Sequence, residues 1–185
     1  IHDDTIDRTT NGKGFVNTLS LRELKTFRIN EKQASEQEQQ IPTLNEVFDL
    51  VNQTCFINIE LKGKGTATAV VALIEEYILE KNWKYADFLV SSFDWNAVQE
   101  VRFLNENIPI GILTETNLDL AFSFAKFMKA EAIHPEFHLL TQENTTQMQA
   151  KGIQVFPWTV NEYEAIQKIK TYNVNGIITD FPDRI

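Results

Sequence analysis

Cysteines, cationic side chains and long apolar runs are all scarce in this chain of 185 residues. Cys55 is the single cysteine, so no disulfide can form within the chain and a cysteine-rich metal site is excluded. This composition is compatible with a reducing compartment, and we expect a cytoplasmic protein. No apolar run approaches the length of a membrane span, so stable membrane insertion is not expected.

The charge balance is strongly acidic. The chain has 17 lysines and arginines against 26 aspartates and glutamates, which gives a formal net charge of −9. Broad binding to nucleic acids or to anionic membranes requires a basic face and is therefore disfavoured. An anionic small-molecule substrate would need a local positive site, such as a metal ion or a few well-placed cations.

The chain does have enough apolar material for one globular domain. Hydrophobic residues make up 43% of the sequence and charged residues 23%, which is typical of a soluble protein with a substantial core. We therefore expect residues 1–185 to form a single domain. Within it, residues 28–42 are mostly polar, which predicts a loop or insertion that ends at Pro42.

Residues 1–14 hold an unusual density of reactive side chains. One histidine, three aspartates and one arginine lie within residues 1–8, and an asparagine and two glycines follow. This composition fits a loop better than a helix or a strand. His2 suits acid or base chemistry near neutral pH, although a histidine that merely bonds to neighbouring aspartates is the commoner case. The aspartates lack the spacing of an EF-hand calcium loop.

Downstream of Pro42, short apolar strands alternate with helices. Thr43 and Glu46 fit a helix-capping box, and apolar residues follow them at helical spacing. Strands are predicted to begin near the following residues: Cys55, Phe88, Ile108, Ala132, Gln154 and Gly176. A helix is expected after each of the first five strands, and Asn161 is expected to cap the last helix. This alternation predicts a parallel sheet built from right-handed β-α-β units.

Polar residues end every predicted strand. They are Glu60 and Lys62; Ser91, Ser92 and Asp94; Thr114 and Glu115; His134 and Glu136; Trp158 and Thr159; and Thr179 and Asp180. A (β/α)8 barrel gathers its chemistry at the carboxyl ends of all its strands, whereas a doubly wound sheet concentrates it at one point. The spread favours a barrel, of which about six of the eight strands fall within this sequence.

Glu60 and Lys62 carry the most specific chemistry among these residues. They are two residues apart on one strand, so their side chains leave the same face. In a barrel that face points inward, where a charge must be paired or bound to an ion. Glu60 is then a hard-oxygen ligand for Ca²⁺ or Mg²⁺, and Lys62 can hold a phosphate oxygen. A solvated edge strand with no function is the competing interpretation.

The aromatic and imidazole side chains at other strand ends each allow two interpretations. Trp158 can line an apolar or alcohol-binding wall at the barrel mouth, or it can be a core aromatic. His134 and His138 lie near a strand end, where a site role is possible. A loop or packing role is simpler for both, because together with Glu136 they do not form a zinc-binding pattern.

Four segments of the sequence resemble, in the same order, the glycerophosphodiester phosphodiesterase family. These segments are His2-Asp3 through Arg8-Thr9-Thr10 with Gly12 and Gly14; Ile59-Glu60-Leu61-Lys62; Trp158-Thr159-Val160-Asn161; and Gly176 through Asp183. Ser91-Ser92-Phe93 is also similar to a Ser-Phe position of the family. The opening segment and the Glu-x-Lys strand are quite specific together, and the other segments support them.

The resemblance implies a TIM barrel that hydrolyses glycerophosphodiesters to glycerol 3-phosphate and an alcohol, with a divalent cation (Ca²⁺ or Mg²⁺) as cofactor. His2 would be one of two catalytic histidines, and Glu60 would be one of three carboxylates that hold the cation. The polar residues 28–42 would belong to a small insertion near the barrel mouth. Substrate contacts would come from four further residues: Lys62, Ser92, Phe93 and Trp158.

The sequence also departs from the family pattern. The family's His-Arg-Gly segment, which supplies the other histidine, and its Glu-x-Asp pair do not occur in the sequence. We expect the natural protein to have an N-terminal part that holds both, together with the first two strands. Two alternatives stay open: a phospholipase D-like lyase on the same fold, and a barrel that binds phosphodiesters without cleaving them.

Overall fold

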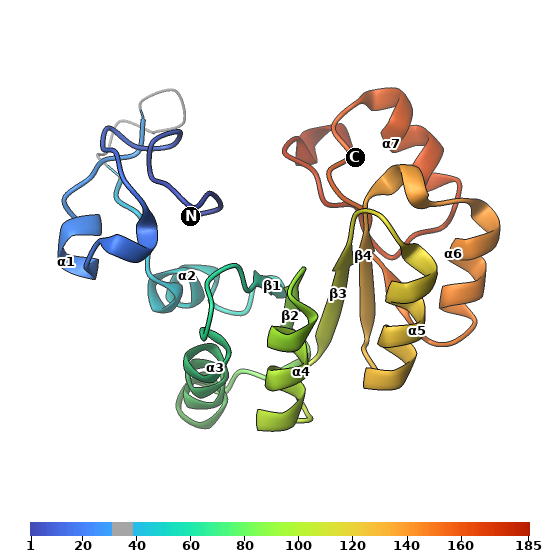
Figure 1. The fold of residues 1–185 in the computed structure, drawn as a ribbon, viewed down its shortest axis with the longest axis horizontal. Coiled ribbons are helices and arrows are strands. Elements are labelled where there is room, and N and C mark those ends of the chain that lie inside the picture. The colour runs from blue at the N-terminus through green and yellow to red at the C-terminus, as the bar shows by residue number, and fades with distance from the viewer. Residues whose placement is uncertain (31–38) are drawn as a thin grey trace. The chain divides into compact units, whose positions relative to one another are not determined.

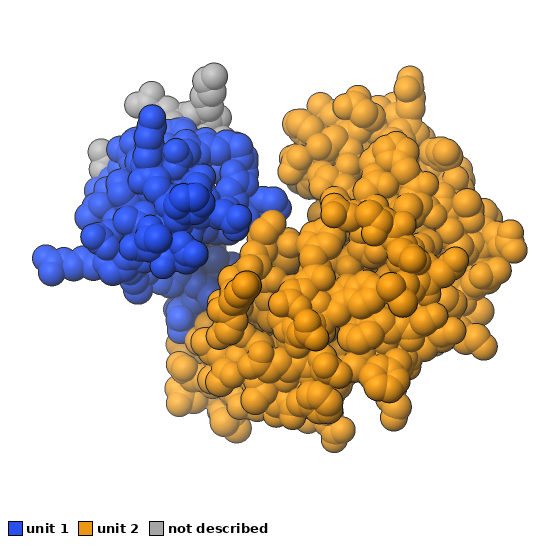
Figure 2. Space-filling model, viewed as in Figure 1, with its two compact units in different colours: residues 1–55 blue, residues 56–185 orange. Residues whose placement is uncertain are grey.

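The computed structural model describes residues 1–30 and 39–185. The chain divides into two compact units, Ile1–Cys55 and Phe56–Ile185, which are coloured blue and orange in Figure 2. Residues 31–38 of the predicted insertion at residues 28–42 lie outside the described residues. The single domain and the insertion stay predictions.

The smaller unit begins with the loop that the sequence predicts, folded back on itself. Antiparallel bridges join Thr5 to Phe15 and Thr10 to Ile29. The side chain of Ile6 is fully buried beneath this loop. The opening segment is therefore an ordered loop, held by its own backbone hydrogen bonds and by one apolar anchor.

Short helical elements complete the smaller unit. They are the 3-10 turn η1 (Val16–Thr18) and the helices α1 (Leu21–Leu24) and α2 (Leu44–Val51). The predicted capping box of α2 is confirmed. The hydroxyl of Thr43 accepts a hydrogen bond from the amide of Glu46, and the Glu46 carboxylate accepts one from the amide of Thr43.

The larger unit contains a parallel sheet of five strands (Figure 1). The strands are β1 (Ile57–Glu60), β2 (Phe88–Ser92), β3 (Ile110–Thr114), β4 (Ala132–Pro135) and β5 (Gln154–Val155). The helices are α3 (Ala67–Lys81), α4 (Trp95–Leu104), α5 (Leu118–Met128), α6 (Gln142–Gln149) and α7 (Tyr163–Lys170). The 3-10 turns are η2 (Tyr85–Asp87), η3 (Phe137–Leu139) and η4 (Pro182–Arg184).

The strands lie in the sheet in the order in which they occur along the chain, β1-β2-β3-β4-β5. Helix α4 packs on both β2 and β3, and α5 packs on both β3 and β4. A doubly wound sheet reverses its strand order at a switch point, whereas a (β/α) barrel does not. The arrangement agrees with the predicted barrel.

The sixth predicted strand, near Gly176, is not a strand in the structure. Its segment still runs beside the chain that follows β5. The amide of Ile178 donates to the carbonyl of Pro157, and the amide of Val160 donates to the carbonyl of Ile178. Pro157 has no amide hydrogen and interrupts the ladder just beyond β5. The predicted count of six strands in this chain was therefore one too high.

The strand register separates apolar from polar side chains. Ile59, Val90 and Ile110 are neighbours across β1, β2 and β3, and all three are buried. Glu60 pairs with Ser91 on the opposite face. Because side chains alternate along a strand, the apolar face can form the core while the other face carries the polar groups.

The helix starts follow the sequence with one exception. Asp94 and Asn117 cap α4 and α5, as each side chain accepts a hydrogen bond from a first-turn amide. The prediction that Asn161 caps α7 was wrong. The side-chain oxygen Oδ1 of Asn161 accepts from the amide of Asp180 instead, and Glu162 occupies the cap position without a side-chain bond. Within residues 1–30 and 39–185, none of the helices combines the length and the apolarity needed to cross a membrane.

Gly111 on β3 is expected to tolerate no side chain. A Cβ atom at this position would lie 2.9 Å from Nε2 of His134, whose ring is buried against Phe156. We expect Gly111→Ala to lower the free energy of unfolding by about 1–3 kcal/mol, as overpacked cores do. Urea denaturation measures the free energy of unfolding. Gly63→Ala is the control, because the added Cβ atom would there lie 3.1 Å from the Thr66 methyl group and not against a buried ring. Equal stability of Gly111→Ala and the original chain would contradict the tight packing.

Candidate functional site

Glu60 and Lys62 lie together at the carboxyl end of β1. The Lys62 Nζ atom is 3.6 Å from Oε1 of Glu60, and the side chains are 35% and 26% exposed respectively. Both side chains therefore leave the same face of the strand, as predicted. Together they form a partly exposed ion pair. Ser91 stands opposite Glu60 on β2, and its hydroxyl donates to Oδ1 of Asn58 at 3.0 Å.

Lys62 borders a hollow of about 250 Å³ between the end of β1 and the start of α4. The hollow is lined by Leu61, Lys62, Gly63, Lys64, Gly65, Asp94, Asn96, Ala97 and Glu100. Two lysines and two carboxylates thus border one space that solvent and small ions can enter. Glu60 is not among the residues that line this hollow.

Ser92, predicted to contact substrate, is buried at the end of β2. Its hydroxyl donates to the carbonyl of Leu61 at 2.6 Å and accepts from the amide of Asp94 at 3.0 Å. These bonds tie the end of β1 to the start of α4. Ser92 thus has a structural role. Its contact with substrate stays a prediction.

Phe93 and Trp158 come together from the ends of β2 and β5. Their ring centroids are 5.3 Å apart and the rings are nearly perpendicular, at 88°. The indole Nε1 of Trp158 donates to the carbonyl of His134 at 2.8 Å, which fixes the orientation of the indole. Edge-to-face rings of this kind form an apolar surface with a defined shape.

Glu136 and His138 form a further pair just beyond β4. The backbone of Glu136 bridges that of Trp158, so both belong to the same group of strand ends. Oε1 of Glu136 lies 2.8 Å from Nδ1 of His138, and Oε2 accepts from the His138 amide at 2.9 Å. His138 itself is mostly exposed. The sequence indicated this pair only by a carboxylate that directly follows a predicted strand. A loop or packing role was therefore the simpler interpretation for His138.

His134 on β4 lies in the core. It is 1% exposed, and neither ring nitrogen has a hydrogen-bond partner among the described residues. Burial lowers the pKa of His134 to about 4, because the charged ring would be desolvated. The packing role that the sequence favoured is confirmed for this histidine. At neutral pH its ring is uncharged.

His2 lies in the smaller unit, where it is bound by residues of its own loop. Its Nδ1 atom is 3.0 Å from Oδ1 of Asp3. Arg8 binds the same carboxylate through two nitrogens: Nε to Oδ2 at 2.7 Å and Nη2 to Oδ1 at 3.0 Å. Hydrogen bonds from Arg8, and then from His2, hold the pKa of the Asp3 carboxyl far below its usual range. Sequence reasoning anticipated an aspartate beside His2 but missed the arginine behind it.

The described residues do not assemble a complete metal site. Across residues 1–30 and 39–185, no group of three or more His, Cys, Asp or Glu side chains is placed so that it could hold a metal ion. Glu60 is a single carboxylate, and its nearest charged partner is the Lys62 ammonium group. One monodentate or bidentate ligand does not satisfy Ca²⁺ or Mg²⁺, which take six or more oxygens between protein and water.

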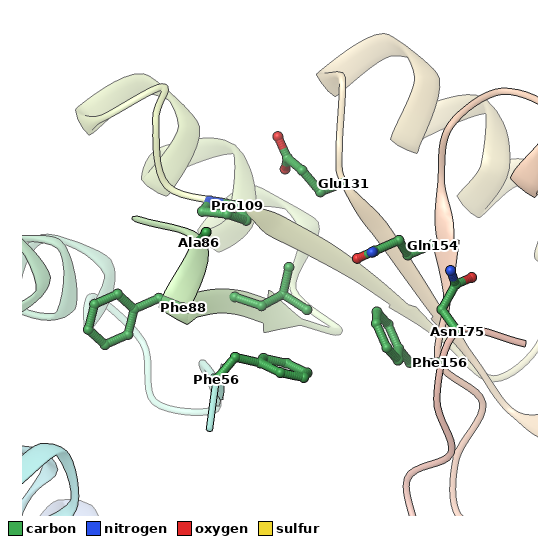
Figure 3. A pocket seen from close by; sticks show the side chains of 9 residues that line it. Phe56, Ala86, Phe88, Pro109, Glu131, Gln154, Phe156 and Asn175 are labelled. Atoms are coloured by element: carbon green, nitrogen blue, oxygen red, sulfur yellow. The ribbon is translucent and has the colours of Figure 1, made fainter. Parts of the chain in front are cut away.

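A larger hollow, of about 380 Å³, lies at the opposite end of the strands (Figure 3). Phe56 directly precedes β1, Phe88 begins β2 and Pro109 precedes β3. The rings of Phe56 and Phe156 approach to 6.2 Å in this hollow. Its lining is mainly apolar and remote from the polar strand ends, so we assign no chemistry to it.

Residues 1–184 match the sequence model of the Glycerophosphoryl diester phosphodiesterase family. The chain belongs to this family. It is 34% identical over 195 residues to a glycerophosphodiester phosphodiesterase from Caldanaerobacter subterraneus subsp. tengcongensis, with 100% of the chain and 77% of that relative covered. A glycerophosphodiester phosphodiesterase from Bacillus altitudinis is 33% identical, again with 100% of this chain and 77% of the relative covered. The chain thus spans about three-quarters of these relatives.

Solved structures of the family share the fold. A phosphodiesterase from Oleispira antarctica, in complex with the product sn-glycerol-3-phosphate, superposes with a TM-score of 0.85 over 100% of this chain and 76% of that one, at 24% identity. A Thermotoga maritima glycerophosphodiester phosphodiesterase gives a TM-score of 0.72 over 97% and 74%, at 25% identity. The predicted α/β class is confirmed, and the parallel sheet with its helices is part of a TIM barrel.

His134 is expected to make the stability of the protein depend on pH. The unfolded chain binds a proton at this ring below its ordinary pKa of 6.5, whereas the folded chain does so only near 4. The free energy of unfolding is therefore unaffected by this ring above pH 6.5. It decreases as the pH falls from 6.5 to about 4, because only the unfolded chain then binds the proton. At ~1.4 kcal/mol per pKa unit, the loss is about 3 kcal/mol.

The test compares His134→Leu with the original chain, with unfolding free energies measured by urea denaturation between pH 4 and 7. His134→Leu should show a shallower decline in stability toward acid than the original chain. An unchanged slope in His134→Leu would contradict the assignment of a buried neutral imidazole.

Proposed function

We propose that this protein hydrolyses glycerophosphodiesters to glycerol 3-phosphate and an alcohol, and is thus a phosphoric diester hydrolase. The observation that carries the proposal is the Glu60–Lys62 pair, 3.6 Å apart at the carboxyl end of a strand in a chain of this family. Exposed ion pairs contribute only about 0–1 kcal/mol to stability. Stability alone therefore gives little reason to hold both charges at a barrel mouth, where substrates bind.

Lys62 supplies the positive charge that an anionic diester needs in this acidic protein. Its ammonium group would bind a non-bridging phosphate oxygen as a point charge. The same contact would draw negative charge away from phosphorus as the attacking oxygen approaches. Phe93 and Trp158 would provide an apolar surface for the carbon atoms of the substrate.

His2 is the proton-transfer group of the proposal. It would take the proton from the attacking oxygen or return one to the departing alkoxide. The attacking oxygen belongs either to water or to the neighbouring hydroxyl of the glycerol group. In the second case a cyclic phosphate forms first and water opens it. A reaction that stops at the cyclic phosphate would make the protein a lyase of the phospholipase D type.

The cofactor of the proposal is a divalent cation, Ca²⁺ or Mg²⁺, with Glu60 as one of its ligands. When bound, such an ion neutralises phosphate charge. The described residues offer this one carboxylate and no group of three ligands, so the steps above are assigned to protein groups alone. A barrel that binds phosphodiesters without cleaving them is the second candidate, and the measurements below distinguish the two.

Glu60→Gln is expected to reduce hydrolysis of glycerophosphocholine by roughly 10²-fold or more, because the amide keeps the shape but loses the charge that holds a cation. Phosphorus NMR follows glycerol 3-phosphate and would also reveal a cyclic phosphate. Glu76→Gln, an exposed position on α3, is the matched control and should keep full activity. Undiminished hydrolysis in Glu60→Gln would overturn the assignment.

Removal of divalent cations with EDTA is expected to abolish hydrolysis, and added Ca²⁺ or Mg²⁺ should restore it. Isothermal titration calorimetry with the restoring metal alone should show weaker binding to Glu60→Gln than to the original protein, because one anionic oxygen ligand is lost. Full activity after EDTA treatment would contradict a metal-dependent reaction. Metal-independent substrate binding without turnover would favour the non-catalytic barrel.

A further inference from the structure

The side chain of His2 is oriented by hydrogen bonding more than by packing. It is 68% exposed, so surrounding atoms restrict its rotation only weakly. Asp3 follows it in the chain, and Oδ1 of Asp3 lies 3.0 Å from His2 Nδ1. A proton-transfer group must hold one nitrogen toward its substrate, and a tether at the other nitrogen achieves this.

Asp3 is itself held from the other side. Arg8 binds both of its carboxylate oxygens in a two-point contact, at 2.7 and 3.0 Å. Such fork-like contacts fix the plane of the carboxylate as well as its position. The backbone between them is pinned as well, since the amide of Ile6 donates to the carbonyl of Gly14 and Ile6 is fully buried. The carboxylate therefore reaches His2 from a loop of defined shape.

The contact determines which ring nitrogen carries hydrogen. The pKa of the Asp3 carboxyl is held far below its usual range, chiefly by the hydrogen bonds from Arg8, so the group is an ionised acceptor. An acceptor at 3.0 Å requires a donor on the ring, so Nδ1 carries the hydrogen. In the neutral ring the lone pair then lies on Nε2.

We propose that Asp3, clamped by Arg8, is a positioning residue that makes Nε2 of His2 the proton-transfer atom. This inference rests on the proposed function, because it assigns a role within the same reaction. Nε2 takes a proton from the attacking oxygen or, once the ring is protonated, returns one to the alkoxide. Asp3 stays ionised throughout and stabilises the charged ring.

The decisive variant is Asp3→Asn, whose amide has nearly the shape of the carboxylate but can donate to Nδ1. It is expected to lower kcat for glycerophosphocholine hydrolysis by up to about 10⁴-fold with little change in KM, because an Asp→Asn change that forces the wrong histidine tautomer costs about 10⁴-fold in a serine-protease triad. Asp3→Glu keeps an anionic acceptor and should recover part of the loss. Arg8→Gln should cost less than Asp3→Asn, since Asp3 remains.

Nitrogen-15 NMR of the His2 ring tests the tautomer without reference to activity. With the ring neutral, the original protein should show hydrogen on Nδ1, and Asp3→Asn should shift the population toward hydrogen on Nε2. A ring that carries its hydrogen on Nε2 in the original protein would overturn the inference. So would an Asp3→Asn variant with unchanged kcat and an unchanged ring spectrum.

Asp4→Asn is the matched control, because it removes the same charge one residue further on from an exposed side chain. It should retain the kcat and the ring spectrum of the original protein, and a loss equal to that of Asp3→Asn would overturn the inference. If the original protein releases no glycerol 3-phosphate from any glycerophosphodiester, the proposed function fails. The NMR result still decides whether Asp3 sets the tautomer.

Discussion

The in-register pairing of parallel strands is the constraint on which the larger unit depends. Parallel strands end at the same edge of a sheet, so the residues after β1, β2, β4 and β5 must come together whatever their separation in sequence. Phe93 and Trp158 are 65 residues apart in number (158 − 93) and yet have ring centroids 5.3 Å apart. The same register buries Ile59, Val90 and Ile110 side by side. One periodicity thus builds the core and gathers the polar strand ends.

Sequence reasoning worked where a short-range rule decides the outcome. The capping box at Thr43 and Glu46 needs four consecutive residues, and the shared face of Glu60 and Lys62 needs only the alternation of a strand. The order of the strands in the sheet also followed from the predicted barrel, because strands joined by short helical crossovers have few alternative arrangements. These features were therefore predictable from residues that lie close together in the chain.

The failures share a different cause, which is competition from distant groups. Asn161 was expected to cap α7, but residues 179–180 compete for its side chain and bind it more fully. The strand near Gly176 lacks a continuous partner because Pro157 interrupts the ladder opposite. The role of Arg8 was missed for a related reason. Its contact with Asp3 spans five residues of irregular loop, for which no periodic rule exists.

His2 and His134 show how environment, more than residue type, separates a reactive histidine from a structural one. His134 is sealed in the core with its pKa lowered to about 4, so it cannot exchange protons readily near neutral pH. His2 is exposed and bound at one nitrogen by an ionised carboxylate. Proton transfer to a substrate requires both access and a fixed orientation. Of these two histidines, His2 has both properties and His134 has neither access nor a hydrogen-bond partner among the described residues.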